Sequence, residues 1–417
     1  MQYGCIGEHL SHSFSKEIHA AIADYAYELR EIPRATQAAF LTEHEFRAIN
    51  VTIPYKQDVI PFLYEIEENA RRIGAVNTIV NRDGKLYGYN TDFDGMTALI
   101  HRAGIPVADK KVLILGTGGT SKTAAAVAKS LDAAAVYKVS RTAGDGVITY
   151  AEALSRHSDA HVLINTTPRG MFSREAGMPI DPLAFPRLCG VVDAVYNPLR
   201  TAFVQCARSA GIPAIGGLYM LVMQAVRAAE IFTGSAIPEE KSAAVYRQVH
   251  LQKENIVLTG MPASGKTTIG RLLAGKLARP FIDTDAEIVK AAGVDIPTLF
   301  ARHGEAAFRD LETAAVRAAA ANTGAVIATG GGAILRAENV DALRQNGRIF
   351  FLDRSPELLL PTADRPTASS REAIKARYTE RLPLYRMTAD AVVPDDEPPQ
   401  AVADRLERMF LNEDFGD

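Results

Sequence analysis

Residues 255–267 read NIVLTGMPASGKT, an apolar strand-like run followed by a loop that fits G-x-x-x-x-G-K-[ST] at every fixed position. A second glycine loop, LGTGGTS at 115–121, follows another apolar run, Lys111–Leu115. Both stretches predict a buried strand, a phosphate-binding turn and then a helix, because glycines and a helix N-terminus let backbone amides face a phosphate. The sequence therefore predicts an α/β protein with two different nucleotide sites.

The overall composition is that of a globular protein with two or three domains. The chain has 417 residues, of which 47% are hydrophobic and 23% charged, and its net charge is −3. Such a charge provides no basic field for nucleic acid or anionic lipid. Neither a signal-peptide pattern nor an apolar run of about 18 residues is visible. We expect a cytoplasmic protein that binds small molecules and neither nucleic acid nor membrane, as a monomer or a homodimer.

Apolar strand-like runs alternate with helical patterns along most of the chain, which favours α/β architecture. The turn at Asp83-Gly84 predicts a hairpin. Residues 235–254 are polar and show no core pattern, so we place a boundary there, on a helix that ends near Leu251. The expected domains are a substrate domain at 1–100 completed by helices at about 217–250, a Rossmann domain at 101–216, and a P-loop domain at 255–417.

The first glycine loop favours NADP over NAD. Gly116, Gly118 and Gly119 would let the backbone approach a pyrophosphate. The next strand ends in Ser140-Arg141-Thr142, where NAD-binding domains usually place an acid on the ribose 2′-hydroxyl; an arginine suits a 2′-phosphate. The alternative is that Arg141 is only a solvated residue at a strand end. The fingerprint is also incomplete, because Ser121 stands where a third glycine is usual.

Several segments of residues 1–235 resemble the shikimate dehydrogenase family, in order along the chain. They are SHSFSKEIH (11–19), NVTIPYK (50–56), GAVNTIV (74–80) with GYNTDFDG (88–95), INTTPRGM (164–171), DAVYNPLRT (193–201) and GLYMLVMQA (217–225). The resemblance implies that Lys56 and Asp92 are the catalytic pair. It implies substrate contacts from Ser13, Ser15, Thr52, Asn77, Tyr196 and Gln224, and adds Ser140, Thr142, Gly217 and Met220 to the NADP site. Glu8 and Lys16 depart from the family, which usually has proline near the serine motif.

The residue types suit the implied chemistry. Reduction of a ketone needs a hydride and a proton for the oxygen, and a lysine beside a carboxylate can supply that proton. Taken alone, Lys56 would be an ordinary surface lysine, and Asp92 could be a helix N-cap. His12 and His19 are expected to orient or pack other groups.

The second loop is a complete Walker A motif. Loop amides would cradle phosphates, Lys266 would reach the β- and γ-phosphates, and Thr267 would bind magnesium. The expected ATP-binding residues are Gly260, Ala263, Ser264, Gly265, Lys266, Thr267 and Thr268. The motif itself allows ATP or GTP and does not identify the acceptor.

Residues 255–410 resemble shikimate kinase. The matching segments are FIDTDAEI (281–288), LFARHGEAAFRDLE (299–312), ATGGGAIL (328–335), DRPTA (364–368) and RLPLY (381–385). The resemblance implies that Asp285 contacts the acceptor hydroxyl and that Asp283 supports magnesium through water. Arg309 and Arg381 would clamp a carboxylate beside Gly330, Gly331 and Gly332, and Arg365 would close from a lid. That lid is short and lacks an arginine the family often has before Arg365. The alternative for Arg309 and Arg381 is a helix-surface ion pair.

The two resemblances name consecutive steps of the shikimate pathway. We therefore expect an oxidoreductase and a phosphotransferase in one chain, which use NADPH, ATP and Mg²⁺ to convert 3-dehydroshikimate to shikimate and then to shikimate 3-phosphate. One alternative is an NAD-preferring quinate/shikimate dehydrogenase, which Arg141 disfavours. Another is a sensor or repressor that keeps the folds only to bind ligands, which the retained Lys56, Asp92 and Lys266 disfavour.

Overall fold

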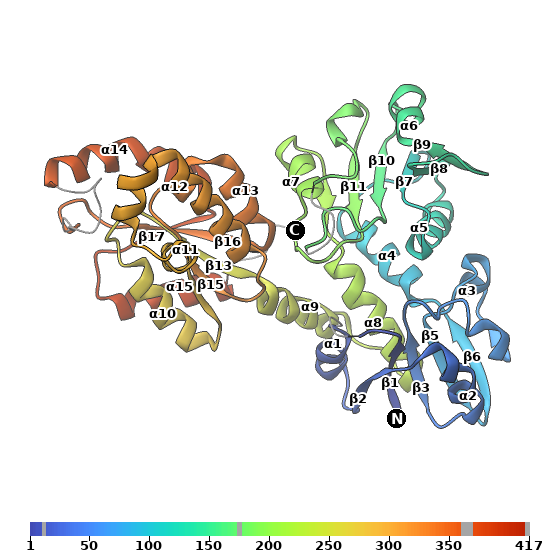
Figure 1. Ribbon diagram of the computed structural model, residues 1–417. Helices are drawn as coiled ribbons and strands as arrows, with labels where there is room; N and C mark the ends of the chain where they lie inside the picture. Colours follow the sequence, from blue (N-terminus) through green and yellow to red (C-terminus); the bar gives the residue numbers. More distant parts are fainter. Residues whose placement is uncertain (11–13, 173–176, 360–369, 413–417) are drawn as a thin grey trace. The chain divides into compact units, whose positions relative to one another are not determined.

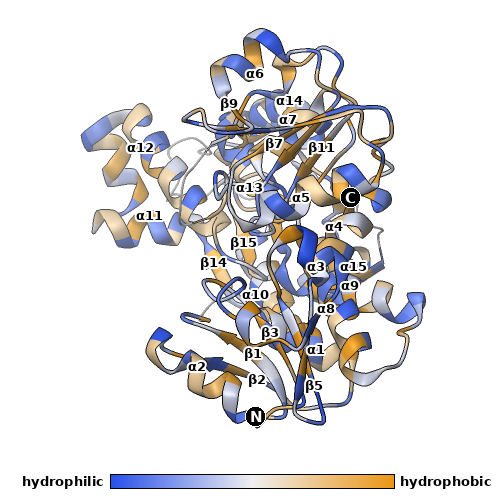
Figure 2. Cartoon of the chain, turned by 90° about the vertical axis from the view of Figure 1, so that its right-hand side faces the viewer, coloured by the Kyte–Doolittle hydropathy of each residue, from blue (hydrophilic) through white to orange (hydrophobic). Residues whose placement is uncertain are grey.

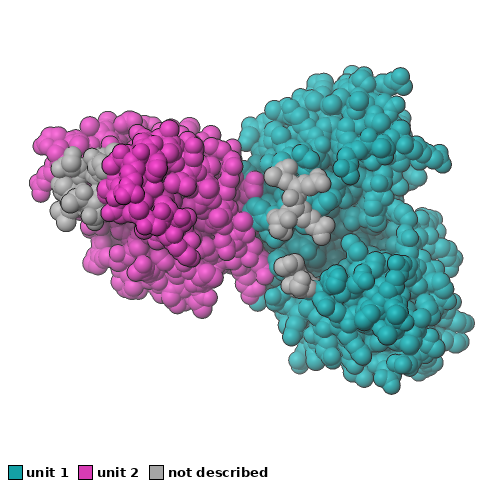
Figure 3. Space-filling view, viewed as in Figure 1, with its two compact units in different colours: residues 1–250, 417 teal, residues 251–416 magenta. Residues whose placement is uncertain are grey.

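The computed structural model describes residues 1–10, 14–172, 177–359 and 370–412. The chain divides into two compact units, Met1–His250 and a second unit that begins at Leu251 (Figures 1 and 3). The first unit itself contains two sheets and the second contains one.

The N-terminal lobe of the first unit is built on a mixed sheet of order β2-β1-β3-β5-β6-β4. Its elements are β1 (Tyr3–Gly7), α1 (Ser15–Ile22), β2 (Tyr27–Glu31), α2 (Arg34–Glu43), β3 (Ala48–Val51), η1 (Ile60–Phe62), β4 (Glu65–Ile66), α3 (Glu68–Ile73), β5 (Thr78–Arg82) and β6 (Lys85–Tyr89). The predicted hairpin is confirmed: β5 and β6 pair antiparallel. Asp83 and Gly84 both have positive φ, 52° and 81°, as a tight two-residue hairpin turn requires.

The second lobe has a wholly parallel sheet of order β12-β11-β10-β7-β8-β9. Its elements are α4 (Thr91–Arg102), β7 (Lys111–Leu115), α5 (Gly119–Ser130), β8 (Ala135–Ser140), β9 (Val147–Thr149), α6 (Tyr150–Arg156), β10 (Val162–Asn165), η2 (Pro182–Ala184), β11 (Gly190–Asp193), α7 (Ala202–Ser209) and β12 (Ala214–Ile215). The glycine loop lies at the carboxyl end of β7, where open parallel sheets bind ligands. The short strand β9 was not predicted, because three residues are too few to show a period.

Two helices, α8 (Leu218–Thr233) and α9 (Glu239–Lys253), return to the N-terminal lobe. Helix α8 packs so closely on α4 that a Cβ on Gly95 would lie 2.5 Å from the Met220 carbonyl oxygen. The expectation that residues 235–254 lack a core pattern is wrong for α9. Val245, Tyr246 and Val249 are buried in one cluster with residues of α1 and α8. These apolar residues occupy one face of a largely polar helix, so they are too few to stand out as a core pattern in the sequence.

The second unit has a parallel five-stranded sheet of order β14-β15-β13-β16-β17. Its elements are β13 (Asn255–Thr259), α10 (Lys266–Leu277), β14 (Phe281–Asp283), α11 (Thr284–Ala292), α12 (Ile296–Ala320), β15 (Val326–Ala328), η3 (Ala333–Leu335), α13 (Ala337–Asn346), β16 (Gly347–Asp353), α14 (Arg371–Thr388), β17 (Ala391–Pro394) and α15 (Pro399–Asn412). Strand β13 is central and buried throughout, so the P-loop that follows it stands at the middle of the sheet edge.

Helices such as α6 and α12 carry hydrophilic and hydrophobic residues together, as elements with one buried face do (Figure 2). Among the described residues, no helix has both the length and the apolar character needed to cross a membrane.

Candidate active sites

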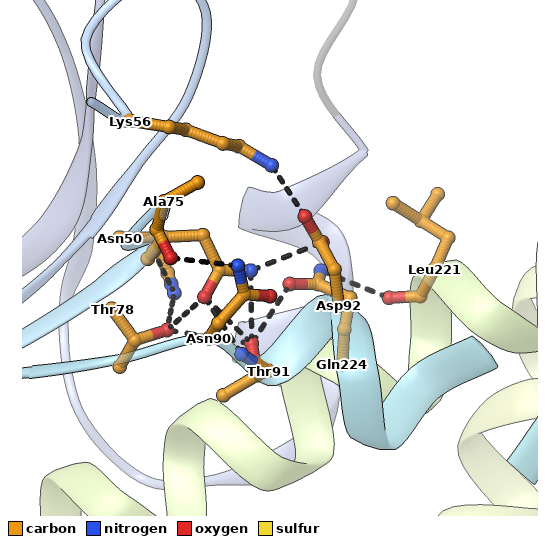
Figure 4. A network of polar contacts seen from close by, with 10 residues as sticks. Asn50, Lys56, Ala75, Thr78, Asn90, Thr91, Asp92, Leu221 and Gln224 are labelled. Carbon is orange, nitrogen blue, oxygen red and sulfur yellow. Dashed lines mark hydrogen bonds and ion pairs between the residues drawn. The ribbon is translucent and has the colours of Figure 1, made fainter. Parts of the chain in front are cut away.

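Lys56 and Asp92 form an ion pair in the first unit. The Lys56 Nζ lies 2.6 Å from the Asp92 Oδ2, and the two side chains are 27% and 17% exposed (Figure 4). Asp92 is not the N-cap of α4: that position is Asn90, which makes no side-chain capping bond. The Asp92 carboxylate instead accepts hydrogen bonds from Lys56 and Asn77. Lys56 is therefore not an isolated surface lysine, and both groups remain open enough to meet a substrate.

Asn77 holds the other oxygen of Asp92. Its Nδ2 donates to the Asp92 Oδ1 at 3.0 Å, and its Oδ1 accepts the backbone N–H of Thr91 at 2.8 Å. Gln224 on α8 reaches the same place, with its Oε1 3.4 Å from the Thr91 hydroxyl (Figure 4). The structure thus brings Lys56, Asn77, Asp92 and Gln224 together from separate elements.

For the remaining predicted substrate residues, the structure shows their positions in the fold but no contact with the Lys56–Asp92 pair among the described contacts. Ser15 is the first residue of α1, and half-buried Thr52 follows β3. Tyr196 follows β11; its ring packs edge-on against Phe14 at 5.5 Å, and burial raises its pKa. Contacts of these three residues with a substrate stay predictions. Ser13 and His12 lie outside the described residues.

The NADP loop has the shape that a pyrophosphate requires. Gly116 has φ +112°, and a Cβ there would lie 2.8 Å from the Thr166 hydroxyl. A Cβ on Gly118 or Gly119 would meet no atom within 4 Å, so this side of the loop is open. The helix α5 begins at Gly119 without a side-chain cap, so the amides that precede Ser121, whose own N–H donates to the Gly118 carbonyl, can face a ligand.

Ser121 and Arg141 are two further residues that bear on the predicted dinucleotide site. The buried Ser121 hydroxyl donates to the Gly118 carbonyl at 2.7 Å, so a serine is accommodated where a third glycine is usual. Arg141 follows β8 and is exposed. Within the described ranges, no ion pair or hydrogen bond occupies its guanidinium. The residue is therefore available for a 2′-phosphate.

The P-loop of the second unit is a strained turn. Gly260, Ala263 and Gly265 all have positive φ, and a Cβ on Gly260 would lie 2.8 Å from the Leu352 carbonyl oxygen. Lys266 Nζ lies across the loop and donates to the carbonyls of Gly260 and Met261 at 3.0 and 2.7 Å. A loop of this shape directs its amides at an anion, and this lysine head can move onto the phosphates.

Thr267 and Asp283 meet as the magnesium prediction requires. The Thr267 hydroxyl donates to the Asp283 Oδ2 at 2.7 Å. Asp283 caps α11 by accepting the backbone N–H of Asp285, which fixes its carboxylate. In the described part of the chain, no group of three or more His, Cys, Asp or Glu residues could hold a metal. The pair fits Mg²⁺, which takes few protein ligands and binds mainly through phosphates and water.

Three consecutive glycines line the predicted acceptor pocket. A Cβ on Gly330 would lie 2.5 Å from the Asp285 Oδ1, and a Cβ on Gly332 would lie 2.1 Å from the Arg309 Nη1. The Gly331 carbonyl accepts from Arg381 Nη1 at 3.0 Å. Glycine is thus needed here for close approach, and Asp285, Arg309 and Arg381 lie around one turn.

Arg309 also pairs within its own helix, with Glu312 at 2.7 Å and Glu305 at 3.0 Å. The pair with Glu312 is buried, because the two side chains are 13% and 1% exposed, whereas Glu305 is 63% exposed and lies at the surface. Sequence reasoning missed Glu312, which is 1% exposed. Burial raises the pKa of its carboxyl group, and the nearby charge of Arg309 offsets only part of that rise. The available signal was an acidic residue three positions after Arg309 in FRDLE, on the same side of a helix. Arg365 lies outside the described residues.

Comparison with known proteins agrees with both halves. The sequence model of the shikimate dehydrogenase substrate-binding domain matches residues 5–79, and that of shikimate kinase matches residues 262–410. A shikimate dehydrogenase (NADP(+)) from Clostridium beijerinckii is 33% identical over 261 residues, covering 58% of this chain and 96% of the relative. The chain belongs to the shikimate dehydrogenase family and also carries a shikimate kinase domain.

Solved structures support the same assignment for the first unit. A chorismate mutase/shikimate 5-dehydrogenase fusion protein from Clostridium acetobutylicum aligns with TM-score 0.56 and 35% identity, covering 59% of this chain and 96% of that one. Shikimate 5-dehydrogenase from Thermus thermophilus, in complex with NADP(H) and shikimate, aligns with TM-score 0.54 and 28% identity, over 60% and 99% of the chains. The expected enzyme class and its cofactors, NADP and ATP with magnesium, are confirmed.

Proposed function

We propose that the protein reduces 3-dehydroshikimate to shikimate with NADPH and then phosphorylates the 3-hydroxyl of shikimate with ATP. The observation that carries the first step is the Lys56–Asp92 pair at 2.6 Å, held by Asn77 at the edge of the substrate lobe. The second step is supported by the P-loop together with the Asp285, Arg309 and Arg381 cluster.

In the reduction, NADPH held at the loop of Gly116, Gly118 and Gly119 would supply the hydride for the carbonyl carbon. Lys56 donates a proton to the developing alkoxide, and Asp92 keeps the ammonium head oriented through its Oδ2. Asn77 and Gln224 contact the ring hydroxyls, while Ser13, Ser15, Thr52 and Tyr196 fix the other end of the substrate. Arg141, between Ser140 and Thr142, selects the 2′-phosphate.

In the phosphorylation, Asp285 accepts the proton of the 3-hydroxyl as that oxygen attacks the γ-phosphorus, and the bond from this phosphorus to the β,γ-bridging oxygen breaks so that ADP leaves. Arg309 and Arg381 hold the carboxylate, because a planar guanidinium matches two carboxylate oxygens. Lys266 stabilises charge on the phosphoryl oxygens, and Thr267 with Asp283 holds Mg²⁺. Arg365 would complete this set from the lid.

A coupled assay on the purified chain tests both steps. It supplies 3-dehydroshikimate, NADPH, Mg²⁺ and ATP, and follows NADPH absorbance together with shikimate 3-phosphate by mass spectrometry. We expect both signals; loss of NADPH without the phosphate product would refute the kinase step, and silence in both would refute the proposal. A clear preference for NADH would refute the role of Arg141.

Two variants test whether the sites act independently. Lys56→Ala should abolish reduction and leave ATP-dependent phosphorylation of added shikimate intact. Lys266→Ala should do the reverse. Loss of both activities in either variant would contradict the assignment of separate sites.

A further inference from the structure

The amide of Asn50, on β3, has only one possible orientation. Its Nδ2 lies 3.3 Å from the main-chain carbonyl oxygen of Asn77 and 3.0 Å from the Thr78 hydroxyl. Because a carbonyl oxygen can only accept, the nitrogen must face Asn77, and the Asn50 Oδ1 must face the other way. That oxygen lies 2.7 Å from the Tyr27 hydroxyl, so Tyr27 must be the donor in this contact.

From Tyr27 the hydrogen bonds run in one direction to the catalytic carboxylate. Tyr27 donates to Asn50, Asn50 to Thr78, and the Thr78 hydroxyl to the Asn77 Oδ1 at 3.0 Å. Asn77 then donates to the Asp92 Oδ1. Figure 4 labels Asn50, Thr78 and Asp92 of this chain. Each donor is polarised by the negative charge at its end, so the links strengthen one another.

The setting of Tyr27 makes it a permanent donor. The residue is 5% exposed, and burial raises its pKa well above the usual value, so it keeps its proton. Its ring stacks on His19 of α1 at 3.9 Å between centroids and 8° between planes. The His19 Nδ1 in turn lies 2.6 Å from the Tyr25 hydroxyl. This contact holds the imidazole in place, and the imidazole holds the Tyr27 ring stacked on it. The hydroxyl therefore cannot turn away from Asn50 without disturbing α1.

We propose that Tyr27 is a positioning residue of the reductase site: its hydroxyl fixes the Asn50 amide, and through Thr78 and Asn77 it fixes the rotamer of Asp92 that holds Lys56. This inference rests on the proposed role of the Lys56–Asp92 pair. Tyr27 itself touches neither Lys56 nor Asp92 in the described contacts. Without the Tyr27 hydroxyl, the buried Asn50 oxygen loses that donor, and the amide can rearrange toward His19, the other polar side chain beside it.

The test is Tyr27→Phe, which keeps the ring and its stacking and removes only the donor. We expect kcat for 3-dehydroshikimate reduction to fall about tenfold, the order of loss when a buried acceptor loses its donor. The KM for NADPH should not change, and phosphorylation by the same chain serves as an internal reference. Tyr3→Phe is the matched control: its ring stacks on Tyr25 in the same aromatic cluster, its hydroxyl takes no part in the donor chain, and the variant should stay within about twofold of the parent.

A double-mutant cycle separates positioning from general loss of stability. Asn50→Ala should lower kcat at least as much as Tyr27→Phe, and adding Tyr27→Phe to it should cost nothing further, because both changes break one chain. Additive losses, or a Tyr27→Phe variant with the parent kcat, would overturn the proposal. If Tyr27→Phe does not fold by circular dichroism, Asn50→Ala with parental kcat would also overturn it. An inactive parent chain would instead refute the proposed function.

Discussion

The close approach of Gly332 to Arg309 makes Gly332→Ala an incisive test of the kinase pocket. A Cβ at position 332 would lie 2.1 Å from the Arg309 Nη1 and 2.6 Å from its Cζ, which is far inside contact distance. The backbone of Gly332 has φ −105° and ψ −2°, which alanine can adopt, so the substitution need not strain the chain. The guanidinium must therefore move away.

The size of the effect follows from what Arg309 is proposed to hold. A hydrogen bond to a charged group contributes about 1.5–3 kcal/mol, so losing the Arg309–carboxylate contact should raise the KM for shikimate roughly 10- to 150-fold. Arg309 can keep its partner Glu305, which is 63% exposed and free to follow it. The buried Glu312 would lose its partner, which costs stability, so circular dichroism must show that the variant is folded before the KM values are compared.

Steady-state kinetics with shikimate as the varied substrate measures this change, with the reductase rate and the KM for ATP as references in the same chain. Gly275→Ala provides the control, since a Cβ there meets no atom within 4 Å and the residue lies inside α10. We expect the control to keep the parental KM. A Gly332→Ala variant with the parental KM for shikimate would refute the placement of Arg309 at the substrate.

The remaining predictions concern charge and pH. Arg141→Ser should raise the KM for NADPH roughly 10- to 150-fold and leave that for NADH nearly unchanged, because only the 2′-phosphate loses a partner; equal changes for both coenzymes would contradict the assignment. Burial raises the pKa of Asp395 from 3.8 to about 6, so the unfolded chain loses this proton first and the stability of the fold decreases as pH rises from 3.8 to about 6. Asp395→Asn should therefore stabilise the second unit above about pH 6, by up to about 3 kcal/mol, and leave it unchanged near about pH 4, which calorimetric Tm values at both pH values would check. Burial lowers the pKa of His19 from 6.5 to about 3, so the unfolded chain takes up the proton first and stability falls as pH drops below about 6.5. His19→Phe should flatten this loss, which at about pH 5 is on the order of 2 kcal/mol, in thermal melts of the first unit.

Much of the fold was predictable because its signals are local. The hairpin at Asp83-Gly84 and the strand Asn255–Thr259 appear where turn residues and apolar runs place them. The role of α9 was not predictable, because Val245, Tyr246 and Val249 become a core face only when α1 and α8 pack on them. Strand β9 forms because it pairs with β8, and a run of three residues is too short to predict that tertiary contact.

The sequence by itself determined both nucleotide loops, since these depend on residue type at fixed spacing along a strand, turn and helix. It predicted the coenzyme preference from Arg141 and, through its resemblance to two families, the residues proposed to carry the chemistry. The tertiary structure alone decided how distant residues meet. It joined Lys56 to Asp92, placed Arg309 against Gly332, and ran a one-way chain of hydrogen bonds from Tyr27 through Asn50. Contacts of this kind depend on packing between elements far apart in the chain, and no local pattern of residues encodes their distances or the direction of their hydrogen bonds.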